Sequence, residues 1–464
     1  MRRLISRFRE RVGDFWWYSL LIFAATRFGD LVQAYIGLWV VPKYVPQADL
    51  GAALPLLQVS SVVGLPLSIL VVPFARWLTI YSARGEYGKV KKMLNIAFMF
   101  VAISFFAALA ISRYLVPAFL DRARLAEGSL GLLILFTGLI GPFSAVFTNA
   151  LQGLKKFNAI AVLQAISSPV RLVVLLVTMP FRAISGYMLG QAVAPAMNIL
   201  GAMISLRKEL GRGIKSVAIG FEDAKKMFRY TLPVAVYVLV GTLMGAWQSL
   251  LFRQRLPEVE SAAFYIISRL GEIATYAGAV LAGVMTPLIA ETVAKGQSET
   301  GLLKKLILGT ILPGLVIVVC LFICGRWLMG AVTLWSDYVE YSPLMARYAF
   351  RMTIAMAVGG FITYEMSAGR FAFLWYWLPV SLAETLILVA LTGYGFFAGI
   401  LPESALNALK ALNACRLSFF IWWQLGASTL LALAATVHIY LRKRTKPCKE
   451  SPSQYRHTTA ARCL

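Results

Sequence analysis

The sequence predicts an all-α, polytopic membrane protein in which about twelve transmembrane helices form two pseudo-symmetric six-helix lobes. The first observation behind this prediction is composition: 59% of the 464 residues are hydrophobic, only 14% are charged, and the mean hydropathy is +0.72. Soluble globular proteins are far less apolar. The net charge of +24 does not indicate nucleic-acid binding, because the charges lie between apolar spans rather than on one face of a soluble fold.

The second observation is an internal repeat. The motif PQAD at 46–49 is answered by PEVE at 257–260, and ARGE at 83–86 by AKGQ at 294–297, both at an offset of 211 residues. A third pair, KKF at 155–157 and GRF at 369–371, has an offset of 214. A repeat of this length divides a membrane protein into two similar lobes. We predict a first lobe over residues 1–206, a cytoplasmic linker over 207–229, a second lobe over 230–440 and a basic cytoplasmic tail over 441–464.

Hydropathy gives the positions of the spans. The first apolar run is too long for the hydrophobic region of a signal peptide and contains Arg27 and Asp30, so we expect it to remain as the first span. The eighth run has no ionisable residue except Arg269 and Glu272, and its 29 residues extend about 43 Å as a helix, more than the roughly 30 Å core of a bilayer. In order, the predicted spans are about 15–41, 48–75, 93–112, 130–153, 159–179, 184–206, 230–252, 262–290, 306–329, 346–366, 372–397 and 414–440.

The distribution of Lys and Arg predicts the orientation. If the N-terminus is cytoplasmic, the terminal and connecting segments on the cytoplasmic side hold 30 Lys and Arg, and the connecting segments on the opposite side hold eight. Because cytoplasmic loops carry the excess of positive charge, we expect both termini in the cytoplasm and the protein in the cell's inner membrane. Two lobes repeated in this way should superpose by rotation about an axis along the membrane normal.

The sequence does not favour catalysis. It has only two histidines, one near a span end and one in the tail, and no predicted outside loop is longer than about 17 residues. Its five cysteines have no paired spacing. A membrane-embedded glycosyltransferase, polymerase or ligase needs a sizeable folded loop with carboxylates. We therefore predict that the protein is not an enzyme, and we assign no catalytic residue, metal or cofactor.

Ionisable residues inside the spans are the candidate functional groups. An arginine near the centre of a transmembrane helix costs about 2.5–3.5 kcal/mol on insertion scales, so Arg27, Arg171 and Arg269 should face a protein interior or a wet cavity. Arg27 with Asp30, and Arg269 with Glu272, have i,i+3 spacing and can neutralise each other on one helix face. A guanidinium paired in this way still has free donors, which favours a cavity or an anionic ligand over simple self-neutralisation.

Two carboxylates lie deep in the second lobe. Glu365 and Glu384 can each bind a proton or a sodium ion, and a structural pair with a nearby arginine is an equally good interpretation. Arg351 is one turn deeper than Arg347, so the sequence places it equally well in the cavity or at the headgroups. The candidate set comprises Arg27, Arg171, Arg269 and Arg351 as substrate-binding cations, Asp30 and Glu272 as charge partners, and Glu365 and Glu384 as ion-coupling groups.

Motifs along nearly the whole chain point to a family resemblance. They are RFGD at 27–30, ARGE at 83–86, NALQGLKKF at 149–157, SRL at 268–270 ahead of Pro287, and AKG at 294–296. With two six-helix lobes, they resemble the polysaccharide biosynthesis (O-antigen flippase) family of the multidrug/oligosaccharidyl-lipid/polysaccharide exporter superfamily. Lipid II flippases and multidrug-toxin extrusion antiporters of that superfamily share part of the pattern, although lipid II flippases usually carry two more spans.

The resemblance implies that the two six-helix lobes form a V-shaped pair of bundles around a central cavity. It also implies that they move an undecaprenyl-diphosphate-linked glycan from the inner to the outer leaflet by alternating access, for O-antigen or other lipopolysaccharide and surface polysaccharide synthesis. It also implies a cationic lumen: Arg27 and Arg269 match basic positions in the first and eighth spans of the flippases, whereas Arg171 and Arg351 are candidates through burial alone. The expected partners are this lipid-linked glycan, membrane lipids and polymerase or glycosyltransferase machinery, with no nucleic acid.

Two other classes of function stay open at this point. A cation-coupled drug antiporter should depend on Glu365 or Glu384 more than on the arginines. An integral-membrane glycan polymerase or ligase should form glycan bonds in vitro.

Overall fold

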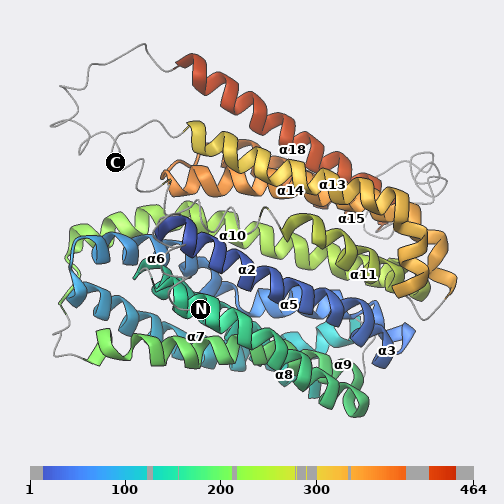
Figure 1. Cartoon of the computed structure of the whole chain (residues 1–464), viewed down its shortest axis with the longest axis horizontal. Helices are drawn as coiled ribbons and strands as arrows, with labels where there is room; N and C mark the ends of the chain where they lie inside the picture. Colours follow the sequence, from blue (N-terminus) through green and yellow to red (C-terminus); the bar gives the residue numbers. More distant parts are fainter. Residues whose placement is uncertain are drawn as a thin grey trace, which may run out of the picture.

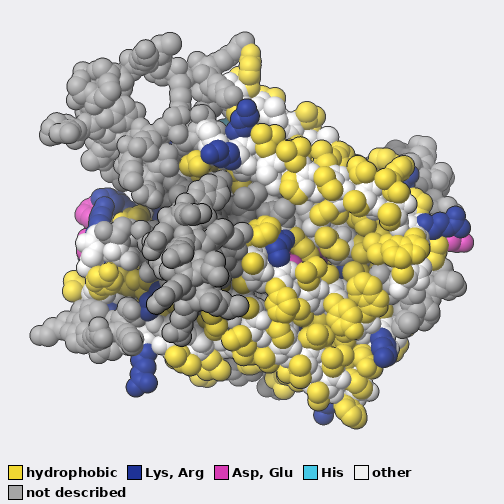
Figure 2. Space-filling model, viewed as in Figure 1, with side chains coloured by type: hydrophobic (Ala, Val, Ile, Leu, Met, Phe, Trp, Pro, Cys, Tyr) yellow, Lys and Arg dark blue, Asp and Glu magenta, His cyan; other side chains and the backbone are white. Residues whose placement is uncertain are grey.

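The computed structural model describes residues 14–122, 129–154, 156–211, 217–276, 278, 289, 300–332, 336–392 and 417–445. Every element in these ranges is a helix, and Figure 1 shows the long helices running side by side. By length and composition, six of the described helices can cross a membrane. Hydrophobic side chains cover much of the coloured part of the face in Figure 2, where few Lys and Arg side chains are seen. The prediction of an all-α, polytopic membrane protein is confirmed.

The helices of the first half follow the predicted spans, but two spans are interrupted. The first span changes from an α-helix to a π-helix at Ile36, and the second breaks at Gly64, where an added Cβ would lie 2.1 Å from the carbonyl oxygen of Gly138. The backbones of α5–α6 and α8 therefore approach closely. The elements are α2 (Asp14–Tyr35), η1 (Ile36–Val40), α3 (Val41–Tyr44), α4 (Gln47–Leu50), α5 (Ala53–Val63), α6 (Leu65–Ala83), α7 (Tyr87–Arg122), α8 (Ser129–Gly153) and α9 (Phe157–Gly211).

The long element α9 consists of two antiparallel helices. The backbone leaves helical geometry at Ala183, with φ 37° and ψ −113°. Gly190 packs against Leu175, and Gly201 packs against Leu163, with less than 2.5 Å between an added Cβ and each leucine Cδ2. These contacts fold the second half of α9 back on the first, which agrees with predicted spans at 159–179 and 184–206.

The second half of the chain begins with α10, a continuous helix, followed by α11, which is buried along most of its length. The predicted eighth span continues past η2 into residues that lie mostly outside the described part of the chain, as do residues 1–13 and most of the predicted tail. The elements are α10 (Phe221–Arg255), α11 (Glu258–Glu272), η2 (Ile273–Thr275), α13 (Thr300–Val332), η3 (Ser336–Tyr341), α14 (Ser342–Ser367), α15 (Leu374–Thr392) and α18 (Leu417–Thr445).

The repeat seen in the sequence recurs in the backbone hydrogen bonds. The amide of Val45 donates to the carbonyl of Val41 at 2.9 Å, and 211 residues later the amide of Leu256 donates to the carbonyl of Phe252 at 2.9 Å. A proline N-cap follows each bond, Pro46 with φ −56° and ψ 149°, and Pro257 with φ −54° and ψ 154°. The two halves therefore share this helix–turn–helix corner.

The second offset recurs in the same way. The amide of Lys156 donates to the carbonyl of Leu151 at 2.8 Å, and 214 residues later Arg370 donates to Glu365 at 2.8 Å. Both bonds span five residues past a helix end, as in a Schellman cap. The bounds assigned to the two lobes remain a prediction.

The two halves meet along α10 and α11. Helix α10 packs against α5 and α6 of the first half and α15 of the second, while α11 packs against α4, η1 and α14. In Figure 1, α10 and α11 lie between the first-half helices and the group α13, α14, α15 and α18. The largest hydrophobic cluster crosses this contact, with Val41 and Leu50 from the first half and Tyr265 and Ile266 from α11.

Candidate functional site

The centre of the candidate site is Arg269 on α11. Its Nη1 donates to Glu272 Oε2 at 2.7 Å across the i,i+3 spacing expected from the sequence, and its guanidinium lies 5.3 Å from the centre of the Tyr265 ring. The arginine is only 8% exposed. Directly after Glu272 the α-helix tightens into the 3-10 turn η2. The arginine end of this ion pair is buried, whereas the side chain of Glu272 is 29% exposed.

Arg27 on α2 reaches the same region from the other half of the chain. Its Nη1 lies 3.0 Å from Asp30 Oδ2, and its Nη2 donates to the backbone carbonyl of Tyr276, just past η2. The guanidinium also lies over the rings of Phe23 and Tyr276, at 5.3 and 5.6 Å from their centres. Arg27 therefore has both its predicted charge partner and a contact across the two halves.

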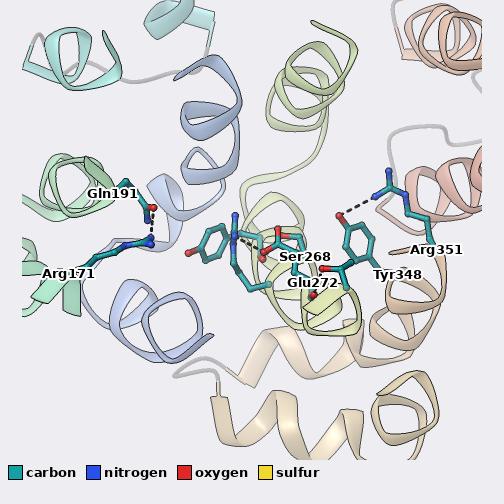
Figure 3. Close-up of polar contacts among 9 residues, drawn as sticks. Arg171, Gln191, Ser268, Glu272, Tyr348 and Arg351 are labelled. Carbon is teal, nitrogen blue, oxygen red and sulfur yellow. Dashed lines mark hydrogen bonds and ion pairs between the residues drawn. The ribbon is translucent and has the colours of Figure 1, made fainter. Parts of the chain in front are cut away.

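Arg171, on α9, is the third arginine of this region. Its Nη2 donates to Oε1 of Gln191, on the returning half of the α9 hairpin (Figure 3). The groups that act electrostatically on Arg171 include Tyr265, Tyr276 and the like charge of Arg269. None of the ion pairs within the described ranges includes Arg171.

The three arginines therefore have an excess positive charge. Arg27 and Arg269 are each paired with a carboxylate, whereas the partner of Arg171 is a neutral amide. A site with one unpaired buried guanidinium next to another arginine is costly to maintain without an anion. Here and below, "arginine cluster" means Arg27, Arg171 and Arg269.

Arg351 lies outside the arginine cluster. Its Nη1 donates to the hydroxyl of Tyr348 at 3.4 Å, and Figure 3 shows Tyr348 between Glu272 and Arg351. Tyr348 packs so closely on α11 that an added Cβ at Gly271 would lie 2.4 Å from its ring. Arg351 is thus connected to the cluster through an aromatic side chain and faces a second group of polar residues, around Glu384.

Each of the four arginines has a buried Nε donor without a hydrogen-bond partner among the described residues. In the part of the chain that the structure describes, the Nε of each is inaccessible to solvent and has no hydrogen-bond partner. Guanidinium groups bind phosphate and carboxylate oxygens through neighbouring N–H donors, and such charge-assisted bonds gain strength away from bulk water. An oxyanion would satisfy these donors where the packing around them opens to admit it. The residues are Arg27, Arg171, Arg269 and Arg351.

Glu384 on α15 lies in a buried polar group of the second half. Both Gln248 and Arg351 act on its carboxylate. Gln248 donates to the Thr385 hydroxyl at 3.1 Å and accepts from Gln424 at 3.3 Å. Glu384 thus has an arginine near it, as a structural ion pair needs, and neutral oxygen atoms near it, as a site for a coupling cation needs. The arrangement fits both interpretations.

Glu365 is separate from all of these residues. It lies 14 residues from Arg351, about 21 Å along α14, and is 1% exposed. One oxygen lies 3.8 Å from Arg370 Nη1, and the other lies 4.0 Å from His438 Nε2. The structure thus places an arginine beside Glu365, as the structural interpretation expects, and does not place Glu365 with the arginine cluster.

Several contact residues could not be singled out from the sequence. Gln191, Tyr276 and Tyr348 are neutral and sit in apolar runs, where they resemble ordinary packing residues. For Gln191 the sequence offered one indication, because the span of Arg171 has no acidic residue that could pair with it. Within the described ranges, no group of three or more His, Cys, Asp or Glu is placed to hold a metal ion.

The comparisons with known proteins agree with this architecture. Residues 72–293 match the family model described as polysaccharide biosynthesis protein. A search of curated proteins found no match. Among solved structures, the MATE transporter VcmN of Vibrio cholerae matches with a TM-score of 0.65 and 14% identity, covering 93% of this chain and 98% of that one.

Two further structures extend the comparison. An inward-facing multidrug resistance transporter of the MATE family and MOP superfamily matches with a TM-score of 0.59 and 13% identity, over 92% of this chain and 100% of that one. A MOP-superfamily transporter from Pyrococcus furiosus, in which the reversed polarity of the binding pocket suggests a different function, matches with a TM-score of 0.60 and 14% identity, over 93% and 98%. The resemblance inferred from the motifs is confirmed: this chain matches the polysaccharide biosynthesis protein family over residues 72–293 and is a multi-pass membrane protein with the fold of the MOP-superfamily transporters.

Proposed function

We propose that this protein is a flippase that moves a lipid-linked oligosaccharide, carried on undecaprenyl diphosphate, from the inner to the outer leaflet by alternating access, for cell-surface polysaccharide synthesis. The observation that carries the proposal is the arginine cluster with its buried, unpartnered Nε donors. The family match is consistent with a role in polysaccharide synthesis.

The chemistry of the cluster suits a diphosphate. Arg27 and Arg269 hold their carboxylates through Nη1, and the Nε of each has no hydrogen-bond partner within the described ranges and is left for a ligand. Arg171 adds a positive charge with no carboxylate in contact. A diphosphate leaving the headgroup region exchanges water for several charge-assisted hydrogen bonds, and its negative charge relieves the repulsion between Arg171 and Arg269. The diphosphate thus supplies negative charge and hydrogen-bond acceptors to the arginine cluster.

The sign of the site's charge separates this function from drug export. An organic cation gains nothing from a cluster of three arginines and two carboxylates, whose net charge is positive. The Pyrococcus transporter of the same fold is a relative in which a change of pocket polarity accompanies a suggested change of function. We propose that the positive cluster here selects anionic head groups.

A cation-coupled multidrug antiporter is the second candidate. The multidrug MATE transporters with the same fold favour it, as do the deep carboxylates Glu365 and Glu384. Under this alternative the carboxylates bind the coupling cation, and the arginines are structural. A lipid II flippase uses the same diphosphate chemistry and differs only in the glycan.

The test is export of lipid-linked glycan in cells that depend on this protein. Arg269→Ala should abolish export at near-normal protein abundance, and Arg269→Lys should restore part of it because lysine keeps the charge but loses the guanidinium fork. Arg326→Ala is the matched control, because Arg326 is exposed on α13 and its loss should leave export unchanged.

Two results would overturn the proposal. One is normal export by Arg269→Ala. The other is normal export combined with loss of organic-cation efflux in Glu365→Gln or Glu384→Gln, which would establish the antiporter.

We further propose that the protein lies in the inner membrane with both termini in the cytoplasm, as the charge distribution favours. Its partners are then the lipid-linked glycan on the cytoplasmic side and the polymerase or glycosyltransferase machinery that makes or extends the glycan.

A further inference from the structure

We propose that Gly37 in η1 is a positioning residue that sets the direction of the Arg269 guanidinium, so that the two halves of the chain together form the anion site. This proposal rests on the proposed function, because it assigns the geometry of the same site. Gly37 itself offers no side chain to a ligand and acts only through Arg269.

The contact between the two residues is tight and crosses the two halves. An ideal Cβ on Gly37 would lie 3.1 Å from Cδ, 3.3 Å from Cγ and 3.8 Å from Cβ of Arg269. Both residues are buried. The backbone of the first span therefore forms one wall of the channel in which the stem of Arg269 lies. A larger residue at 37 must move that stem.

Arg269 has little freedom to move aside. Its Nη1 is held by Glu272 at 2.7 Å, and its guanidinium lies on the ring of Tyr265. The stem is thus fixed at its tip by the ion pair and along its length by Gly37. Because Nε lies directly after Cδ in the side chain, a displacement of Cδ re-aims this donor, which is buried and has no partner in the described part of the chain.

The backbone around Gly37 has a conformation that its counterpart in the second half does not have. Residues 36–40 form a π-helix with an unbroken run of buried positions at Ile36, Gly37 and Leu38. At the offset of 211 residues, the counterpart segment lies inside α10, which is an uninterrupted α-helix from Phe221 to Arg255. The position equivalent to Gly37 is Gln248. The internal repeat thus has a π-turn only in the copy that touches Arg269.

The π-turn and the glycine have a common consequence. Such single-turn bulges often occur at functional sites, because the extra residue re-aims the backbone on one side of the helix. Here the bulge brings a residue without a Cβ onto Arg269. The first span then carries Arg27 on one turn and Gly37, which contacts the stem of Arg269, on another. The positions of two of the three arginines therefore depend on this one span.

The test uses purified full-length protein in detergent and inorganic pyrophosphate as the probe. Gly37→Ala and Gly37→Val form a graded series, and Gly141→Ala and Gly141→Val are matched controls, because a Cβ at Gly141 has no atom within 4 Å. Gly37→Val should weaken pyrophosphate binding about tenfold, which corresponds to one charge-assisted hydrogen bond. Gly37→Ala should have a smaller effect, and the Gly141 variants should bind as the unmodified protein does.

A double-mutant cycle, read out as melting temperatures, separates a positioning role of Gly37 from general damage to the fold. Gly37→Val should lower the melting temperature by about 2 °C or more when Arg269 is present, and by much less in the Arg269→Ala background, where the stem is gone. An equal loss in both backgrounds overturns the proposal. So does unchanged pyrophosphate affinity in Gly37→Val when the unmodified protein binds. If the unmodified protein does not bind pyrophosphate, the proposed function itself fails, whatever the cycle gives.

Discussion

Arg27 donates a hydrogen bond from Nη2 to the backbone carbonyl of Tyr276, a residue 249 positions further along the chain. Tyr276 follows directly on the 3-10 turn η2. The same arginine holds Asp30 at 3.0 Å. One guanidinium therefore connects the first span to the end of α11, and any relative movement of the two halves at this point must break or remake that bond.

This connection predicts different outcomes for two substitutions of Arg27. Arg27→Ala should lose both the contact and a positive charge and should reduce glycan export strongly. Arg27→Lys keeps the charge but replaces the planar guanidinium fork by a compact ammonium, so it should keep part of the activity. Export measured at matched protein abundance tests this, and equal activity of the Ala and Lys variants would show that the charge of Arg27 is irrelevant.

The glycine that follows α14 predicts a change in stability. Gly369 has φ +74°, and an added Cβ would lie 3.2 Å from Arg76 Nη1. Gly85 has φ +73° with no atom within 4 Å. Alanine at either position should cost about 1–2 kcal/mol because of the left-handed backbone, and Gly369→Ala should cost more because Arg76 must also move. Thermal unfolding in detergent measures both. A smaller loss for Gly369→Ala than for Gly85→Ala would contradict this explanation.

The sequence was sufficient to predict the fold class, and it singled out the three arginines of the cluster as candidates. Long apolar runs predict helices whatever their packing, and Arg27, Arg171 and Arg269 stand out because a charge in such a run is costly. The short repeated motifs also led to real structural elements, since the backbone bonds at Val45 and Leu256 match at the same offset of 211.

The rest of the site depends on contacts between distant segments, which the sequence does not encode locally. Gly37 is one of 36 glycines, and only its proximity to Arg269 distinguishes it. Likewise, nothing in the spacing of Arg351 indicates that the ring of Tyr348 separates it from the other arginines. Spans are predictable from hydropathy, but their relative rotation is set by packing and is not.

A contact near the predicted cytoplasmic end predicts a pH dependence. Lys89 Nζ lies 2.9 Å from Asp223 Oδ2, and this hydrogen bond lowers the pKa of Asp223 below its ordinary value. A lowered folded-state pKa means that Asp223 stabilises the fold above the unfolded pKa of about 3.9, and that this stabilisation is lost as the pH falls through the folded pKa.

The matching experiment compares Asp223→Asn with the unmodified protein. The variant should melt at a slightly lower temperature at pH 7, and the difference should shrink toward pH 3. The neighbouring Glu222→Gln is the control and should show no such trend. A difference that is constant with pH would mean that the ion pair with Lys89 does not contribute.

The orientation predicts where reporter fusions are active. Fusions at Gly211 and Glu450 should be active only with cytoplasmic reporters, because the charge bias places both segments inside. A fusion that is active outside the cytoplasm at either point would reverse the orientation and the direction of transport.

The most direct test of the central claim is binding of a lipid-linked glycan to the purified protein, with undecaprenyl diphosphate and undecaprenyl monophosphate carriers compared side by side. We expect tighter binding of the diphosphate. We also expect a loss of about tenfold or more in Arg171→Ala and Arg269→Ala, since each removes charge-assisted hydrogen bonds, and no loss in Arg326→Ala. Equal affinity for the two carriers, or diphosphate binding that is unchanged in both arginine variants, would contradict the central claim.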